Sequence, residues 1–240
     1  MAHIFFDFDS TLVSVETLDV LISTKLETTA QKKAIEKITA QGMVGEIPLF
    51  ESLSKRLSVA KISQQDVQEL SQKLPQFITQ NLADIIESLQ QNGHKIHILS
   101  GGFKDYMHHT ATALNIPKNN IHANEFTYGE DGVINGLNQQ NPLCQNGGKG
   151  QVISHLNLKE KVILIGDGYT DLEVYLEGKC RHFIGFGIHE SRDIIKEKAP
   201  FFIKNIDELN SILDELLTNE KWKRMHSLNK NKINNPTINE

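Results

Sequence analysis

The chain has 240 residues, of which 39% are hydrophobic and 23% charged, and its formal net charge is −5. This composition is typical of a soluble globular domain, and the acidic balance disfavours a surface built mainly to bind nucleic acid. The cysteines, Cys144 and Cys180, form no CxxC pair, which disfavours a disulfide scaffold or cysteine zinc site and favours a cytoplasmic location. No stretch approaches the ~18–20 apolar residues needed to cross a bilayer, so we expect no membrane association.

Short apolar runs separated by helical patterns indicate an α/β fold. The runs typical of buried strands are His3–Phe8, Lys95–Leu99, Val162–Ile165, His182–Phe186 and Phe201–Ile203. Helical patterns lie between them, for example at Leu82–Gln91 and Lys104–Leu114. Strands that alternate with helices predict a doubly wound, Rossmann-like parallel sheet, in which ligands bind at the carboxyl ends of the strands.

Residues 15–75 interrupt this alternation. The segment has no convincing strand, and amphipathic patterns predict helices at Thr28–Ala40 and Gln64–Leu74. We interpret it as a helical cap inserted into a catalytic core made of residues 1–14 and 76–218, since such insertions often cover a site.

Two further segments differ from the sheet pattern. Asn124–Gly136 contains β-rich residues on both sides of Gly-Glu-Asp-Gly, which predicts a small β-hairpin. Residues 219–240 are rich in Asn and Lys, and we expect a disordered tail there rather than a nucleic-acid-binding arm.

Paired aspartates follow two of the predicted strands. Asp7 and Asp9 come after the first strand, and alternation along an extended chain would point both carboxylates to one side. Asp167 and Asp171 come after Val162–Ile165, separated by residues that include a turn glycine. Either pair alone could be a set of turn or helix-capping acids, but together they supply the oxygen ligands that Mg²⁺ prefers.

Groups suited to a phosphate follow other strands. Ser100, Gly101 and Gly102 come after Lys95–Leu99, and we expect them to open a helix with backbone amides available for an anion. Lys149 lies in the sequence GGKG, which lacks the spacing of a Walker A loop. A serine, backbone amides and a lysine can hold a phosphate, while an aspartate can act as a nucleophile and form an aspartyl-phosphate.

These motifs, read in order as DFDST, ILSGG, GGKG and IGDGYTD, resemble those of the haloacid-dehalogenase-like hydrolases. Within that superfamily the chain resembles the phosphoserine phosphatase family, from about residue 3 to residue 217. The resemblance implies a Mg²⁺-dependent hydrolase that acts on a small phosphorylated metabolite, most simply O-phosphoserine.

The resemblance also implies roles for single residues. Asp7 is expected to be the nucleophile and a metal ligand, and Asp9 the acid/base that also lends its backbone carbonyl to the metal. Asp167 completes the metal ligands, with Asp171 supporting them. The expected phosphate-binding residues are Ser100, Gly101, Gly102, Lys149 and Thr170.

Substrate selection is assigned by the same resemblance to residues near and within the cap. Glu16 is expected to bind the amino group of the substrate and Arg56 its carboxylate, which suits an acid and a guanidinium fork. Met43, Gly45 and Leu49 fall where relatives shape the pocket.

Three positions depart from the family pattern. Val44 replaces a glycine, Leu49 stands where phenylalanine is frequent, and Tyr169 takes the place of a small residue. These departures leave the phosphatase chemistry intact and weaken the assignment of serine as the alcohol.

Alternatives to the phosphoserine hypothesis remain open at this point. The enzyme could act on another small phosphomonoester, or it could transfer the phosphoryl group to an alcohol instead of water. A different class of protein, a phosphoryl-accepting regulatory module without turnover, would use a similar acidic pocket. Asp9 argues against that module, because a long-lived phosphoaspartate needs no acid/base two residues away.

Overall fold

The computed structural model describes residues 1–218, and a six-stranded parallel sheet forms its centre. The strands, in the spatial order β3-β2-β1-β6-β7-β8, are β3 (Ile121–Asn124), β2 (Lys95–Phe103), β1 (Ala2–Phe6), β6 (Lys161–Gly166), β7 (His182–Phe186) and β8 (Phe201–Ile203). The chain passes from β1 to β2 on one side and later to β6 on the other, so the strand order reverses at β1. The predicted doubly wound α/β fold is confirmed.

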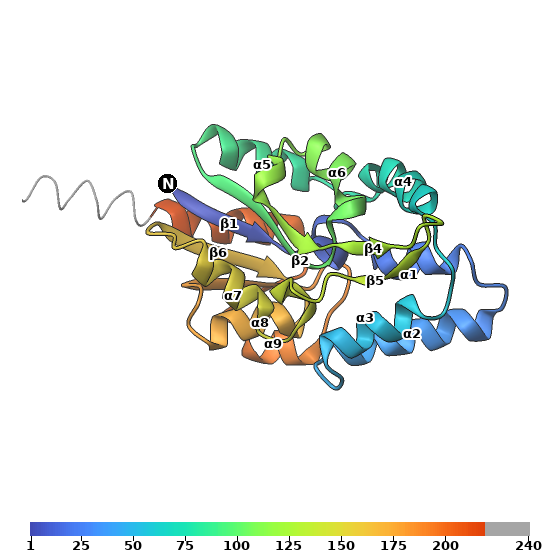
Figure 1. Cartoon of the computed structure of the whole chain (residues 1–240). Helices are drawn as coiled ribbons and strands as arrows, with labels where there is room; N and C mark the ends of the chain where they lie inside the picture. The colour runs from blue at the N-terminus through green and yellow to red at the C-terminus, as the bar shows by residue number, and fades with distance from the viewer. Residues whose placement is uncertain (219–240) are drawn as a thin grey trace, which may run out of the picture.

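Helices cover both faces of this sheet, which explains why the strands are apolar throughout (Figure 1). In β1, Ile4 and Phe6 belong to one apolar cluster whereas Phe5 belongs to another, as side-chain alternation requires. The first face carries α5 (Leu82–Gln91), α6 (Lys104–Ala113) and the helical residues 206–218; the second carries α7 (Gly148–His155), α8 (Tyr169–Leu176) and α9 (Asp193–Lys198).

The inserted segment contains α1 (Thr17–Ser23), α2 (Thr29–Met43), α3 (Leu49–Leu57) and α4 (Gln64–Lys73). Helix α1 contacts the other three, whereas α4 packs mainly on α6 of the sheet domain. Figure 1 shows α2 and α3 side by side at one end of the molecule. The part of the inserted segment that faces the functional site, described below, is therefore made by α1, α2 and α3.

A two-stranded hairpin, β4 (Phe126–Tyr128) and β5 (Ile134–Leu137), joins the sheet domain to the inserted segment. The backbone N–H of Ile134 donates to the carbonyl of Ile62 at 2.8 Å, and Gln64 N–H donates to the carbonyl of Gly132 at 2.9 Å. The predicted hairpin is confirmed, and these bonds tie it to the start of α4.

Several boundaries differ from the sequence-based prediction. The first strand ends at Phe6 rather than Phe8, because the chain enters a wide turn, Phe8–Leu12, which is kinked at Asp9 and Ser10 where the backbone is not helical. Strand β2 continues through Ser100–Gly102, so this motif lies in extended chain and the following helix begins only at Lys104. The four-residue strand β3 was not predicted.

Smaller differences concern the helices and the tail. Helix α2 runs to Met43, three residues beyond the predicted end, and α4 ends at Lys73. The tail predicted for residues 219–240 lies outside the described residues. Among residues 1–218, no helix is both long enough and apolar enough to cross a membrane.

Candidate active site

The first acidic turn begins where the central strand ends. Asp7 N–H donates to the Ile165 carbonyl at 2.8 Å, which continues the pairing of β1 with β6 by one residue. Its carboxylate Oδ1 accepts from the backbone N–H of Phe8 at 2.7 Å. The strand itself ends at Phe6, but the backbone of Asp9 is still extended, with φ −68° and ψ 141°. Thr17 N–H donates to Asp9 Oδ1 at 2.8 Å, and both aspartates line one cavity.

The second acidic turn lies beside the first, after β6. Asp7, Asp167 and Asp171 each place one carboxylate oxygen within 4.8 Å of the others, and all three residues are buried. A Cβ at Gly166 would lie 2.3 Å from the Cγ of Asp171, so glycine at this position leaves the space that the Asp171 side chain occupies. Three buried oxygen donors of this kind fit Mg²⁺, which prefers carboxylates and would offset their mutual repulsion.

Lys149 is buried among these acids rather than exposed in a loop. It lies in the first turn of α7, and its Nζ is 2.7 Å from Asp171 Oδ1 and 3.1 Å from Asp7 Oδ1. Burial alone would lower the pKa of Lys149, but the charges of Asp171 and Asp7 outweigh it and hold that pKa above its ordinary value. The lysine therefore stays charged at the edge of the sheet.

The extended residues Ser100, Gly101 and Gly102 form another part of the cavity wall. Gly102 N–H donates to Ser100 Oγ at 3.0 Å. A Cβ at Gly102 would lie 2.9 Å from Asp9 Oδ2, so glycine is needed for this segment to reach the acid. The side chain of Asn124, which sequence reasoning missed, donates to the carbonyl of Gly101 at 2.8 Å and fixes the segment from β3.

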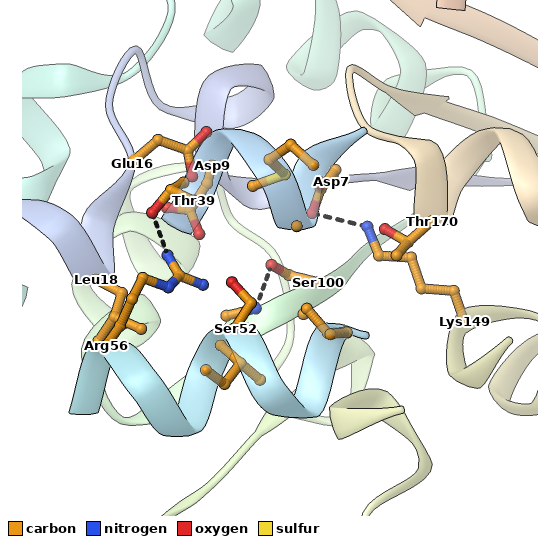
Figure 2. Close-up of a pocket in the computed structure, with 16 residues that line it drawn as sticks. Asp7, Asp9, Glu16, Leu18, Thr39, Ser52, Arg56, Ser100, Lys149 and Thr170 are labelled. Atoms are coloured by element: carbon orange, nitrogen blue, oxygen red, sulfur yellow. Dashed lines mark hydrogen bonds and ion pairs between the residues drawn. The ribbon is translucent and has the colours of Figure 1, made fainter. Parts of the chain in front are cut away.

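The cap supplies the facing wall of the cavity, as Figure 2 shows. Glu16, Met43 and Arg56 all line it, together with Thr170 from the start of α8. Ser10 Oγ donates to Glu16 Oε1 at 2.8 Å. The cavity therefore lies between the cap and the carboxyl ends of the strands.

The three departures from the family pattern have different consequences. Val44 is 37% exposed and is not among the residues that line the cavity, so its side chain does not narrow the pocket. Leu49 lines the cavity, and its N–H donates to Asn146 Oδ1 at 2.9 Å. Tyr169 packs on Gly45, where a Cβ would lie 3.1 Å from the ring. Gly45 contacts this ring and is not among the lining residues.

Arg192, which precedes α9, is the main residue of the site that sequence reasoning missed. Its Nη1 forms an ion pair with Asp167 Oδ2, and its Nη2 lies 3.6 Å from Glu16 Oε1. The guanidinium thus joins the acidic cluster to the cap side of the cavity. The sequence did offer a signal for Arg192, since it is a basic residue in the loop after β7. That strand ends at the same edge of the sheet as the strands that carry the aspartates.

Burial and like charges shift the carboxyl groups of the cavity. Burial and the charge of Glu16 raise the pKa of Asp9, and burial also raises the pKa of Glu16 against the opposing effect of Arg192. Burial and the charge of Asp7 raise the pKa of Asp171 to about 7. Asp9 is therefore suited to hold a proton near neutral pH and to donate it.

Comparison with known proteins places these features in a family. Residues 4–175 match the model of the haloacid dehalogenase-like hydrolases. Phosphoserine phosphatase of Bos taurus is 32% identical over 213 residues, which cover 88% of this chain and 92% of the relative.

Solved structures give the same relation. A phosphoserine phosphohydrolase-like protein from Francisella tularensis superposes with a TM-score of 0.83 at 34% identity, over 88% of this chain and 99% of that one. A phospho-aspartyl intermediate analogue of phosphoserine phosphatase has a TM-score of 0.73 at 26% identity, over 89% and 98% of the two chains.

Proposed function

The chain belongs to the haloacid dehalogenase-like hydrolase family and is a phosphoric monoester hydrolase, and from this premise we propose that it hydrolyses O-phosphoserine through an aspartyl-phosphate on Asp7. One observation carries the proposal. One cavity brings Asp7, Asp9 and Lys149 together with Glu16, which lies beside Asp9, and with Arg56 on the facing wall. The first group suits phosphoryl transfer, and the second suits an amino acid.

The nucleophile is Asp7. Its Oδ1 accepts hydrogen bonds from the Phe8 N–H and the Lys149 ammonium, which fixes the carboxylate in one orientation. Within residues 1–218 no donor is bonded to Oδ2, so this oxygen is available to attack phosphorus. The new Oδ2–P bond forms as the bond from phosphorus to the serine oxygen breaks.

Asp9 acts as the general acid in the first half-reaction and as the general base in the second. Its raised pKa keeps a proton on the carboxyl group, and that proton passes to the leaving serine oxygen. The resulting carboxylate then takes a proton from water, whose oxygen attacks phosphorus and releases Asp7 and inorganic phosphate. The Thr17 N–H bond to Oδ1 holds the side chain in place for both steps.

The phosphate is held by cations and hydroxyl or amide donors. Lys149, Ser100, Thr170, Gly101 and Gly102 line the same cavity as Asp7, and the Gly102 N–H, which donates to Ser100 Oγ here, would turn to the phosphate when it binds. Fixed donors of this kind stabilise charge on the transferring group without reorganisation.

The acidic cluster is the proposed magnesium site. Asp7, Asp167 and the backbone carbonyl of Asp9 would hold Mg²⁺, with Asp171 supporting them from beside Lys149. When bound, Mg²⁺ supplies positive charge that offsets the phosphate and the crowded carboxylates.

Substrate selection and location complete the proposal. Glu16 would pair with the ammonium of phosphoserine and Arg56 with its carboxylate. The two cysteines are free and buried, which supports a reducing compartment such as the cytoplasm.

Phosphate release from a panel of esters, with and without Mg²⁺, tests the proposal. We expect the highest kcat/KM for O-phosphoserine, and little activity after chelation of the metal. A higher kcat/KM for O-phosphoethanolamine or an aryl phosphate would contradict the substrate assignment. Formation of O-phosphohomoserine from O-phosphoserine when homoserine is added would instead show transfer to an alcohol.

A further inference from the structure

Three helices of the cap meet at the buried side chain of Arg56. Arg56 lies in α3, Asp19 in α1 and Thr39 in α2. Arg56 Nη1 donates to Asp19 Oδ1 at 3.1 Å and to Thr39 Oγ1 at 3.1 Å, and the Thr39 hydroxyl donates to Asp19 Oδ2 at 2.6 Å. The three side chains therefore form a closed ring of hydrogen bonds beside the cavity.

This ring uses one end of the guanidinium and leaves the other edge free. Both hydrogens of Nη1 are taken by Asp19 and Thr39. Arg56 Nε is buried and has no hydrogen-bond partner among residues 1–218, and no hydrogen bond from Nη2 is formed in that part of the chain. The Nε–Nη2 edge has the spacing that binds a carboxylate through two parallel hydrogen bonds. Arg56 lines the cavity, with its guanidinium labelled opposite Asp7 and Lys149 in Figure 2.

Burial makes the partner of this arginine important. Arg56 is only 5% exposed, and a buried guanidinium without an opposite charge is strongly destabilised. Asp19 supplies that charge from the Nη1 end, away from the unpaired edge. Thr39 adds a second, uncharged acceptor, and its own donation to Asp19 fixes the carboxylate.

We propose that Asp19, assisted by Thr39, is a positioning residue that aims the Nε–Nη2 edge of Arg56 at the carboxylate of the substrate. The inference rests on the proposed function, because that function gives the free edge its ligand. Asp19 does not touch the substrate itself. It selects for esters that carry a carboxylate by keeping Arg56 in one orientation.

The test compares O-phosphoserine with O-phosphoethanolamine, which keeps the amino group and lacks the carboxylate. Asp19→Ala is expected to raise KM for phosphoserine about tenfold and Thr39→Val about threefold, as the loss of one charged and one neutral hydrogen bond predicts. The change for phosphoethanolamine, measured as KM or as Ki in competition, should stay below about twofold, with kcat nearly unchanged. Asp19→Asn, which retains one acceptor, should fall between wild type and Asp19→Ala.

A double-mutant cycle separates this role from general support of the cap. In an Arg56→Ala background, Asp19→Ala should change KM for phosphoserine by less than about twofold, since there is no guanidinium left to position. Asp84→Ala, on the exposed side of α5, is the matched control and should behave as wild type. If Asp19→Ala does not fold, as judged by its thermal melt, Thr39→Val and Asp19→Asn provide the same comparison.

The outcomes distinguish the inference from the function on which it rests. Equal losses for both substrates in the Asp19 and Thr39 variants, or additive effects in the cycle, would overturn the positioning role. If Arg56→Ala is selective for phosphoserine and the Asp19 variants are not, only the inference fails. If Arg56→Ala affects both substrates alike, carboxylate recognition by Arg56 fails, and the inference fails with it.

Discussion

The two walls of the cavity are built in different ways. On the sheet side, Asp7 continues the β1–β6 pairing, and glycines at 102 and 166 allow contacts that a Cβ would prevent. On the cap side, Arg56 is held by side chains from neighbouring helices. The hydrogen bond from Leu49 N–H to Asn146 links the start of α3 to the sheet domain.

We infer from this difference that the sheet wall performs the proposed chemistry and that the cap wall selects the substrate. Groups fixed by strand ends keep the sub-ångström positions that phosphoryl transfer needs. Groups on helices of an inserted segment can move with it when substrate enters. Substitutions on the sheet wall should therefore affect all phosphate esters equally, whereas those on the cap wall should depend on the ester.

The largest effect is expected on the sheet wall, at Asp7. Asp7→Asn should lower kcat by at least about 10⁴-fold for every ester, because the amide cannot attack phosphorus. Steady-state phosphate release measures this loss, with Asp84→Asn as the exposed control. A variant that retains most of its activity, or loses it for phosphoserine alone, would break the assignment of chemistry to this wall.

Lys149→Met should have the next largest effect, also uniform across esters. We expect kcat/KM to fall by about 10²- to 10³-fold, as for removal of one strong donor to the transferring group. The exposed Lys159 gives the matched control, Lys159→Met. A loss confined to esters with a carboxylate would instead place Lys149 in substrate selection.

Much of the sheet wall could be predicted from sequence, for a physical reason. Asp7, Ser100 and Asp167 each follow an apolar run, and parallel strands bring their carboxyl ends to one edge. The wide turn that carries Asp9 left no sequence signal, since it depends on contacts such as the Thr17 N–H bond.

The cap wall was less accessible to sequence reasoning. Glu16 and Arg56 were named only through the family resemblance, and Asp19 and Thr39 were not recognised, because helix packing sets which residues meet. Arg192 lies far from Asp167 and Glu16 in the sequence, and only the folded chain brings it between these two residues. The burial of Lys149 was not predicted either, because no local sequence pattern indicates it.

On the cap wall, Glu16→Gln should act selectively. KM for phosphoserine should rise about tenfold because the charge that pairs with the ammonium is lost. The desamino analogue 3-(phosphonooxy)propionate should change by less than about threefold. Equal changes for both esters would place Glu16 with the sheet-wall residues and weaken the distinction between the walls.

Tyr169 tests the contact between the walls, since it belongs to α8 and packs on Gly45 of the cap. Tyr169→Ala should raise KM about threefold for all esters by weakening cap closure, with a smaller change in kcat. Tyr175→Ala on the same helix, outside the cavity lining, is the control. A change in ester preference would show that Tyr169 shapes the pocket directly.

The smallest effect on activity is expected at His97, away from both walls. It forms a row with the buried His3 and the half-buried His122, at nitrogen separations of 2.9 and 3.3 Å. Burial and the neighbouring histidines lower the pKa of His97 to about 3. Below a pH of about 6.5, which is the ordinary pKa of histidine, the His97 side chain is therefore protonated in the unfolded chain but stays neutral in the folded chain.

The resulting pH dependence concerns stability. The free energy of unfolding should fall as pH drops from about 6.5 towards 4, by up to about 1.4 kcal/mol per pH unit for this one proton. His97→Asn should flatten that slope and leave kcat at neutral pH unchanged. Denaturant unfolding of both proteins at several pH values measures the free energy of unfolding. If the variant kept the wild-type pH dependence, the lowered pKa of His97 would be contradicted.

Mass spectrometry of the acid-quenched enzyme tests the central claim most directly. After brief mixing with Mg²⁺ and O-phosphoserine, peptide mapping should find a phosphoryl group on Asp7, and the adduct should be absent from Asp7→Asn. A phosphoryl group on another side chain, or turnover of phosphoserine by Asp7→Asn at the wild-type rate, would contradict the account.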